Sequence, residues 1–155
     1  DLLFPHHANE IAQSETLTGQ PLAQHWLHGG FVNFKDGKMA KSVGNVVNLD
    51  DLAAKKITPL AFRLLLLQVH YRQDLDFSWD ALVASQTRLE RLKKQLASLP
   101  DGGQVDENLR QKFVANLEDD LNLPRSLALI SGAKLDPATT RATWLNFDQV
   151  FGLGL

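Results

Sequence analysis

A series of helical segments, each preceded by a suitable capping residue, constrains the fold of this chain more than any other feature. Asn48 is placed to cap one helix, and the Thr-Pro pair at 58–59 opens another that we expect to reach about His70. Ser78 then caps a longer helix that should run to about residue 99. The apolar residues of this helix recur at helical spacing: Leu82, Leu89, Leu92, Leu96 and Leu99. The middle of the chain is therefore predicted to be α-helical.

The last third of the sequence continues this pattern. A linker at 100–103 precedes a further long segment, Pro124 starts a short helix that should end near Gly132, and the Asp-Pro pair at 136–137 caps the last helix. The large apolar side chains of this region are expected in the core: Leu109, Phe113, Leu117, Trp144, Phe147 and Phe151. With helices joined by short connections, residues 79–155 are predicted to form an antiparallel helical bundle.

The first 35 residues are predicted to form a small α/β piece. Residues 5–15 and 21–28 are expected to be short helices, and residues 31–34 are strand-like. The Lys-Asp-Gly sequence at 35–37 is a turn that carries the Asp-Gly signal of a hairpin. Because no sheet partner for the strand is evident in this piece, we expect it to present an unpaired edge, and to be mobile or non-natively packed when expressed alone.

Composition narrows the classes of function. The chain has 155 residues, of which 44% are hydrophobic and 22% charged, so a core of domain size can form. No apolar stretch is long enough to cross a bilayer. The net charge of −2 means that any contact with RNA would be local. The first residue, Asp1, is not Met and lies in an apolar motif, which indicates a truncated start.

A possible metal site lies in the sequence Phe-Pro-His-His-Ala-Asn-Glu at residues 4–10. His6 and Glu10 are four residues apart, so a helix places them on one face within reach of a shared ion. Imidazole and carboxylate are both zinc ligands, but the chain has no cysteine, and two ligands cannot close a tetrahedral site. A solvated helix face explains the same spacing. His7 is expected to point away and to pack or bind backbone.

A possible phosphate-binding loop follows at residues 38–45. Lys38 and Lys41 flank Met39 and Ala40, and their ammonium groups can approach a polyphosphate from two sides, where they would meet developing charge. Gly44 permits close approach of the backbone to a ligand. A solvated basic surface loop is the alternative interpretation. The basic residues Arg88, Arg91, Lys93 and Lys94 are expected to form a solvated helix face.

Taken together and in order, these segments resemble the cysteinyl-tRNA synthetase family of class I aminoacyl-tRNA synthetases. Residues 38–42, Lys-Met-Ala-Lys-Ser, are similar to the family's KMSKS loop, with Ala40 at its first serine. Loss of that hydroxyl removes one hydrogen bond, worth about 0.5–1.5 kcal/mol, which should weaken the function of the loop without abolishing it. The other similar segments are residues 1–15, 26–28, 30–32, 70–72, 119–124 and 150–155.

The resemblance implies a role for each matching residue. His6 and Glu10 match two of four zinc ligands, in a site whose Zn²⁺ binds the thiolate of the cysteine substrate. Lys38 and Lys41 match the lysines that contact ATP, which is used with Mg²⁺. The implied partners are L-cysteine, ATP and tRNA(Cys), and the implied protein is a cytoplasmic monomer without membrane contact. The resemblance adds a second interpretation of Arg88, Arg91, Lys93 and Lys94, as a surface along the tRNA.

The resemblance also implies a division of the chain and leaves alternatives. Residues 1–35 would be the C-terminal part of a Rossmann-like α/β catalytic domain, residues 36–78 a connector that carries the KMSKS loop, and residues 79–155 a helical bundle, so the fragment is mainly α. The HIGH motif, two zinc-binding cysteines and an anticodon-binding domain are absent, so the fragment alone is expected to be inactive. Two alternatives remain: the cysteine:glucosaminyl-inositol ligases of mycothiol synthesis, and a non-catalytic paralogue that binds tRNA or protein.

Overall fold

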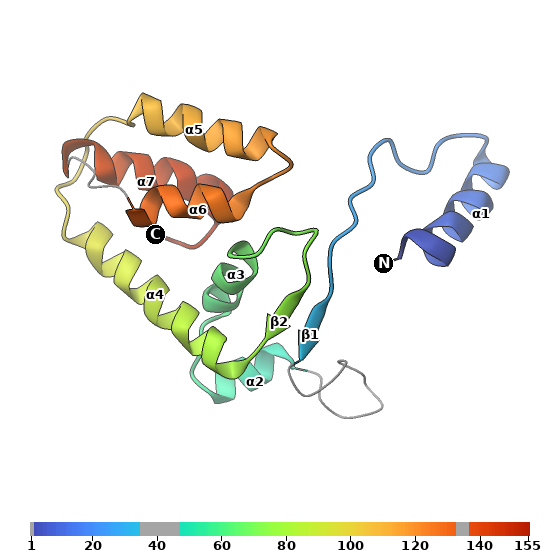
Figure 1. Ribbon diagram of the computed structural model, residues 1–155, viewed down its shortest axis with the longest axis horizontal. Coiled ribbons are helices and arrows are strands. Elements are labelled where there is room, and N and C mark those ends of the chain that lie inside the picture. Colours follow the sequence, from blue (N-terminus) through green and yellow to red (C-terminus); the bar gives the residue numbers. More distant parts are fainter. Residues whose placement is uncertain (1, 35–46, 133–136) are drawn as a thin grey trace.

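The computed structural model describes residues 2–34, 47–132 and 137–155. The described part is mainly helical and contains two short parallel strands (Figure 1). Within these ranges no helix combines the length and the apolar character needed to span a bilayer. The expectation of a mainly α chain is therefore confirmed.

The helices in the middle of the chain start where the capping residues predict. Asn48 and Asp51 form a reciprocal capping box at the start of α2 (Leu49–Ala54). The Thr58 side chain accepts a hydrogen bond from the Leu60 amide at the start of α3 (Pro59–Leu67). Ser78 likewise caps α4 (Trp79–Ala97). In each case a side chain satisfies an amide that the first helical turn leaves unpaired.

The strand predicted at residues 31–34 has a partner, so the expectation of a strand without one is wrong. β1 (Val32–Phe34) pairs in parallel with β2 (Leu75–Phe77), in the register Val32 with Leu75 and Phe34 with Phe77. The hairpin signal at 35–37 lies outside the described residues. The sequence gives no short-range sign of this pairing, because parallel strands are joined by a long crossover, here through α2 and α3.

Two apolar cores hold the body of the molecule. One lies around α2, α3 and the two strands: Leu52, Ile57, Ala61, Leu65, Leu75, Phe77 and Leu82. The other joins α3 and α4 to α5 (Glu107–Glu118), α6 (Leu123–Gly132) and α7 (Pro137–Phe151). Phe113 stacks on Phe147 with ring centroids 4.1 Å apart, and both are buried. The aromatic residues Trp144 and Phe151 lie in this second core, as their spacing predicts.

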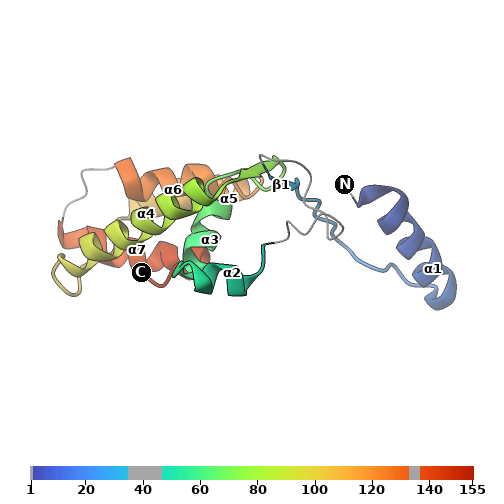
Figure 2. The same ribbon diagram turned by 90° about the horizontal axis from the view of Figure 1, so that it is seen from below.

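The N-terminal elements stand apart from these cores. A π-helical turn, η1 (Leu3–His7), leads into α1 (Ala8–Thr18), which ends at Gly19 in the left-handed region (φ 66°). An extended stretch then carries the chain to β1, and α1 lies well away from the other helices in both views (Figures 1 and 2). The helix predicted at residues 21–28 does not form. Its side chains are almost all exposed, and a helix this short needs tertiary packing to be stable.

Candidate metal and substrate site

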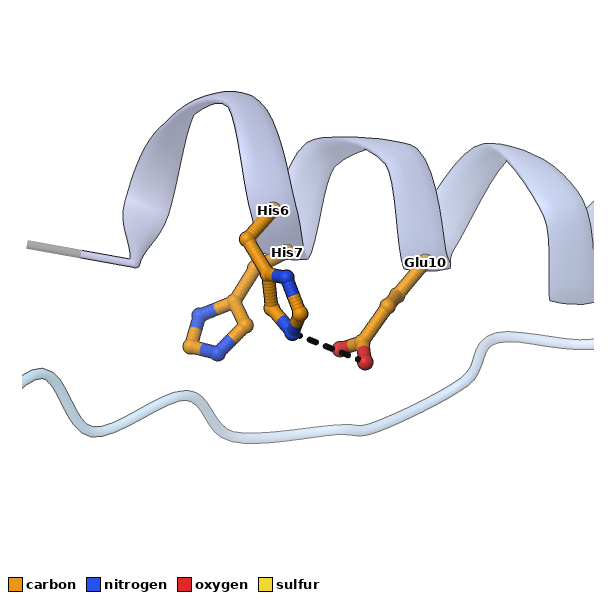
Figure 3. Close-up of side chains that lie close together, drawn as sticks. All are labelled: His6, His7 and Glu10. Atoms are coloured by element: carbon orange, nitrogen blue, oxygen red, sulfur yellow. Dashed lines mark ion pairs between the residues drawn. The ribbon is translucent and has the colours of Figure 1, made fainter. Parts of the chain in front are cut away.

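The predicted pair His6 and Glu10 lies at the junction of η1 and α1. Their side chains point the same way along the helix, with His6 Nε2 3.2 Å from Glu10 Oε1 (Figure 3). Both are about half exposed, at 58% and 49% of their side-chain area. The pair is therefore open to solvent and free to accept an ion and further ligands.

His7 joins this pair, which the sequence did not predict. One ligand atom from each of His6, His7 and Glu10 lies within 4.8 Å of the other two, so the three form a cluster able to hold a metal ion. The expectation that the His7 ring points away rested on regular α-helical geometry. The backbone at His7 is α-helical (φ −65°, ψ −34°), yet its ring centroid lies 5.6 Å from that of His6, so the two imidazole rings come close although successive side chains leave a helix in different directions.

The His7 ring is oriented by the extended stretch that follows α1. Its Nδ1 lies 2.9 Å from Nε2 of His28, and its ring packs on that of Trp26 at 5.1 Å between centroids. Trp26 in turn stacks on the His28 ring. The two contacts of His7 join residues 21 and 19 positions apart in the sequence, so no local pattern predicts them. His7 is the least exposed member of the metal-binding cluster.

The donor set of this cluster fits zinc. Imidazole nitrogen and carboxylate oxygen are both ligands that Zn²⁺ accepts, at distances that the clustered atoms can reach with small side-chain movements. A hydrogen bond to the second nitrogen of a ligating histidine commonly fixes the orientation of the ring, and His28 supplies such a contact to His7. Any thiolate ligands would have to come from outside this chain, which has no cysteine.

The predicted ATP-binding lysines, Lys38 and Lys41, lie outside the described residues. The described residues end at Phe34, the last residue of β1, and resume at Val47, two residues before α2. Between these two elements lies a pocket of 330 Å³, whose lining is almost entirely apolar: Val32, Phe34, Val47, Asn48, Leu49, Leu52, Phe62 and Phe77. The roles of the two lysines remain predictions.

A polar network joins the two sequence landmarks at 70–72 and 119–122. Arg72 holds Asp120 with two hydrogen bonds, Nε to Oδ2 at 2.6 Å and Nη2 to Oδ1 at 3.0 Å, and the Tyr71 hydroxyl donates to Oδ1 at 2.7 Å. His70 Nε2 lies 3.0 Å from the Asp120 carbonyl oxygen. Hydrogen bonds from Arg72 and then Tyr71 lower the pKa of Asp120 from 3.8 to about 2.

This network fastens the loop after α3 to the turn between α5 and α6. A pocket of 290 Å³ lies beside it, bounded by β1, the 70–73 loop and the turn that contains Leu121. The sequence showed both landmarks but not their contact, because 48 residues separate Arg72 from Asp120.

Comparison with known proteins identifies the family. Residues 1–87 match the model for the catalytic domain of class I (C) tRNA synthetases. The chain is 45% identical, over its whole length, to a protein of Burkholderia lata named cysteine–tRNA ligase 1, of which it covers 34%. It is 43% identical to the cysteine–tRNA ligase of a Sulfurihydrogenibium species, over 85% of this chain and 30% of that protein. For a Picosynechococcus species the identity is 45%, over 84% of this chain and 28% of the relative.

The chain thus spans about a third of the length of the curated relatives it matches. The family match covers more than half of this chain and includes η1, α1, both strands, α2 and α3. The chain therefore belongs to the class I (C) tRNA synthetase catalytic domain family.

Proposed function

We propose that the protein of which this chain is part is a cysteine–tRNA ligase. It would activate L-cysteine with ATP to cysteinyl-adenylate, releasing pyrophosphate, and then transfer the cysteinyl group to tRNA(Cys). The observation that carries the proposal is the similarity, along the whole chain, to a relative that is itself named a cysteine–tRNA ligase. No feature of the described residues favours an amino-sugar acceptor or a non-catalytic role.

In this proposal His6 and Glu10 hold the Zn²⁺ ion, and the clustering of their ligand atoms supports that assignment. Zinc, when bound, favours a deprotonated sulfur and so distinguishes a thiol substrate from a hydroxyl one. His7 belongs to the same cluster, and its contact with His28 holds its ring in place. The half-exposed position of the cluster leaves one side free for the substrate and for ligands from the rest of the protein.

Lys38 and Lys41 are proposed to bind ATP, which would enter with Mg²⁺. As the cysteine carboxylate attacks the α-phosphorus, their ammonium groups would stabilise the charge on the α-phosphate and on the departing pyrophosphate. The apolar pocket between β1 and α2 lies beside both ends of the segment that carries them. We further propose the division at residues 35 and 78 into catalytic piece, connector and antiparallel helical bundle, and a cytoplasmic monomer.

The test is cysteine-dependent exchange of pyrophosphate into ATP by the full-length protein. We expect exchange with cysteine but not with serine, and a fall of at least about 100-fold in Lys41→Ala, since groups that stabilise transition-state charge are worth that much. Lys112→Ala is the matched control, because Lys112 lies exposed on α5. Absence of exchange from folded, zinc-loaded protein, or equal exchange in both variants, would disprove the assignment.

The zinc assignment has a separate readout in the metal content of the protein. We expect His6→Ala to lower bound zinc and to weaken the selection of cysteine over serine. His25→Ala is the control, because His25 is exposed and lies outside the cluster. Full zinc occupancy in His6→Ala would rule out His6 as a ligand.

A further inference from the structure

Arg88 lies where three helices meet, outside the site described above. From α4 its guanidinium group reaches α3 and α6, with Nη1 donating to Gln68 Oε1 at 3.1 Å and Nη2 donating to Ser131 Oγ at 2.7 Å. Both acceptors are neutral. A guanidinium group has five N–H donors, so three of them remain after these two bonds.

No carboxylate compensates the charge of Arg88 among the residues that the structure describes. Four other arginines form ion pairs with aspartate or glutamate: Arg72, Arg110, Arg125 and Arg141. Arg63 donates to the Phe151 carbonyl oxygen at the end of α7. Within the described ranges, the arginines without an anionic partner or a helix-terminal carbonyl are Arg88 and Arg91.

The Arg88 side chain opens into a pocket of 390 Å³ that has no acidic lining. Its walls are formed by Gln68, Arg88, Pro124, Leu127, Ala128 and Ser131. A cation in a pocket without acidic lining suits an anion, with Arg88 as the donor, because the donor hydrogens of Gln68 and Ser131 are already used within the protein. A cation would be repelled by Arg88, and a purely apolar ligand would leave the remaining N–H donors unpaired.

Arg91 adds a second positive charge one helical turn further along α4. Residues three apart on a helix are neighbours, and two like charges there repel each other. Partial burial lowers the pKa of Arg88, and the charge of Arg91 lowers it further. Arg91 does not line the pocket, but its charge acts on Arg88, so an anion bound at Arg88 would relieve both the desolvation and the repulsion.

Resting on the function proposed above, we propose that Arg88 binds a backbone phosphate of RNA and that Arg91, exposed on the same helix, adds positive charge beside it. The planar fork of a guanidinium group matches a phosphate with two parallel hydrogen bonds. The chain as a whole carries a net charge of −2, so a contact with RNA has to be made by a local cluster of this kind. A polyanion is favoured over free phosphate, because the open site holds few groups with which to enclose a small ion.

The experiment measures binding of an unmodified tRNA(Cys) transcript to the full-length protein over a range of salt concentrations. The variants are Arg88→Gln and Arg91→Gln. Arg110→Gln is the matched control, because Arg110 lies on α5 and is paired with Glu107. Circular dichroism and thermal unfolding establish that each variant is folded. If Arg88→Gln fails to fold, the exposed Arg91→Gln decides the matter, because no described contact depends on its side chain.

We expect each variant at the site to bind the transcript roughly tenfold more weakly, with a salt slope lower by about one, and the control to bind as wild type. Wild-type affinity and slope in Arg91→Gln and in folded Arg88→Gln would overturn the proposal. A second arm tests inorganic phosphate at matched ionic strength. The contrary outcome is that phosphate raises the unfolding temperature of the wild type but not of the variants, while wild type and variants bind the transcript equally well. In that case the site binds free anions and the assignment to RNA is wrong.

Discussion

At the scale of single residues, Gly30 lies where two backbone segments almost touch. A Cβ atom at this position would overlap backbone atoms of Gln73 and Asp74, closer than any ordinary contact. The close approach brings the Gly30 amide to the Tyr71 carbonyl oxygen at 2.7 Å and the Phe31 amide to Asp74 Oδ1 at 2.7 Å. Glycine here permits the pairing of β1 with β2.

We predict that Gly30→Ala lowers the free energy of unfolding by about 1–3 kcal/mol, because backbone atoms cannot yield as a flexible side chain would. Gly29→Ala is the matched control, since its Cβ would meet only the Tyr71 carbonyl oxygen at an ordinary 3.5 Å. Denaturant unfolding of both variants measures the difference. Equal stability of the two would show that the segments can separate without cost.

Asp120 gives a prediction about pH. Its pKa is lowered from 3.8 to about 2 by Arg72 and Tyr71, so its ionised form stabilises the fold. That contribution is complete above about pH 4 and is lost as the pH falls toward 2. In Asp120→Asn it is missing at every pH, while asparagine still tolerates the positive φ of 55°.

The unfolding temperature of the wild type should therefore exceed that of Asp120→Asn at neutral pH, and the gap should close between about pH 4 and pH 2. Thermal unfolding at several pH values measures it. Asp76→Asn is the control, because Asp76 is exposed on β2. A gap that stays constant as the pH falls would mean that the ionisation of Asp120 does not stabilise the fold.

At the scale of elements, the Asp148 side chain binds residues 152–155, which follow α7. Its Oδ1 and Oδ2 accept hydrogen bonds from the amides of Leu153 and Leu155, at 2.8 and 2.9 Å. Gly152 makes the turn at φ 60°, and Leu153 is fully buried in the core. The C-terminal residues after α7 thereby close one end of the helical core.

We predict that Asp148→Ala lowers the free energy of unfolding by about 1.5–3 kcal/mol, since it removes two hydrogen bonds to a charged group. Asp76→Asn again serves as the surface control and should change the stability by less than about 0.5 kcal/mol. Chemical denaturation compares the two. If Asp148→Ala lowers the stability no more than the control does, burial of Leu153 alone holds residues 152–155 in place.

At the scale of the whole molecule, the N-terminal elements contribute little to the core. None of the residues of α1 is buried, whereas α4 buries five. Large apolar side chains are exposed around α1, among them Leu3, Phe4 and Leu17 at 63%, 78% and 86%. Exposed apolar side chains grouped in this way mark a surface for packing, so in the full-length ligase proposed above we expect other residues to cover it.

Hydrogen exchange tests this expectation. In the 155-residue chain, amides of α1 should exchange much faster than those of α4, because α1 opens without disrupting any buried cluster. In the full-length protein the α1 amides should become protected while those of α4 stay as they were. Equal protection of α1 in both proteins would show that the rest of the protein does not pack on this helix.

Much of the local structure was predictable from the sequence. Caps at Asn48, Thr58 and Ser78 placed three helix starts, because a side chain that satisfies the first amides acts over only a few residues. Apolar spacing placed Phe113 and Trp144 in the core for the same local reason. The spacing of His6 and Glu10 likewise put two potential ligands on one face.

What the sequence by itself determined, then, is most of the helices of residues 47–155, the apolar residues of the core and a pair of candidate metal ligands, because each depends on neighbours along the chain. The tertiary structure decided the pairing of β1 with β2, the contact of Arg72 with Asp120 and the placing of His28 against His7. His7 and His28 are 21 positions apart, and Arg72 and Asp120 are 48 positions apart. Such contacts form only when packing brings distant segments together, so no local spacing encodes them.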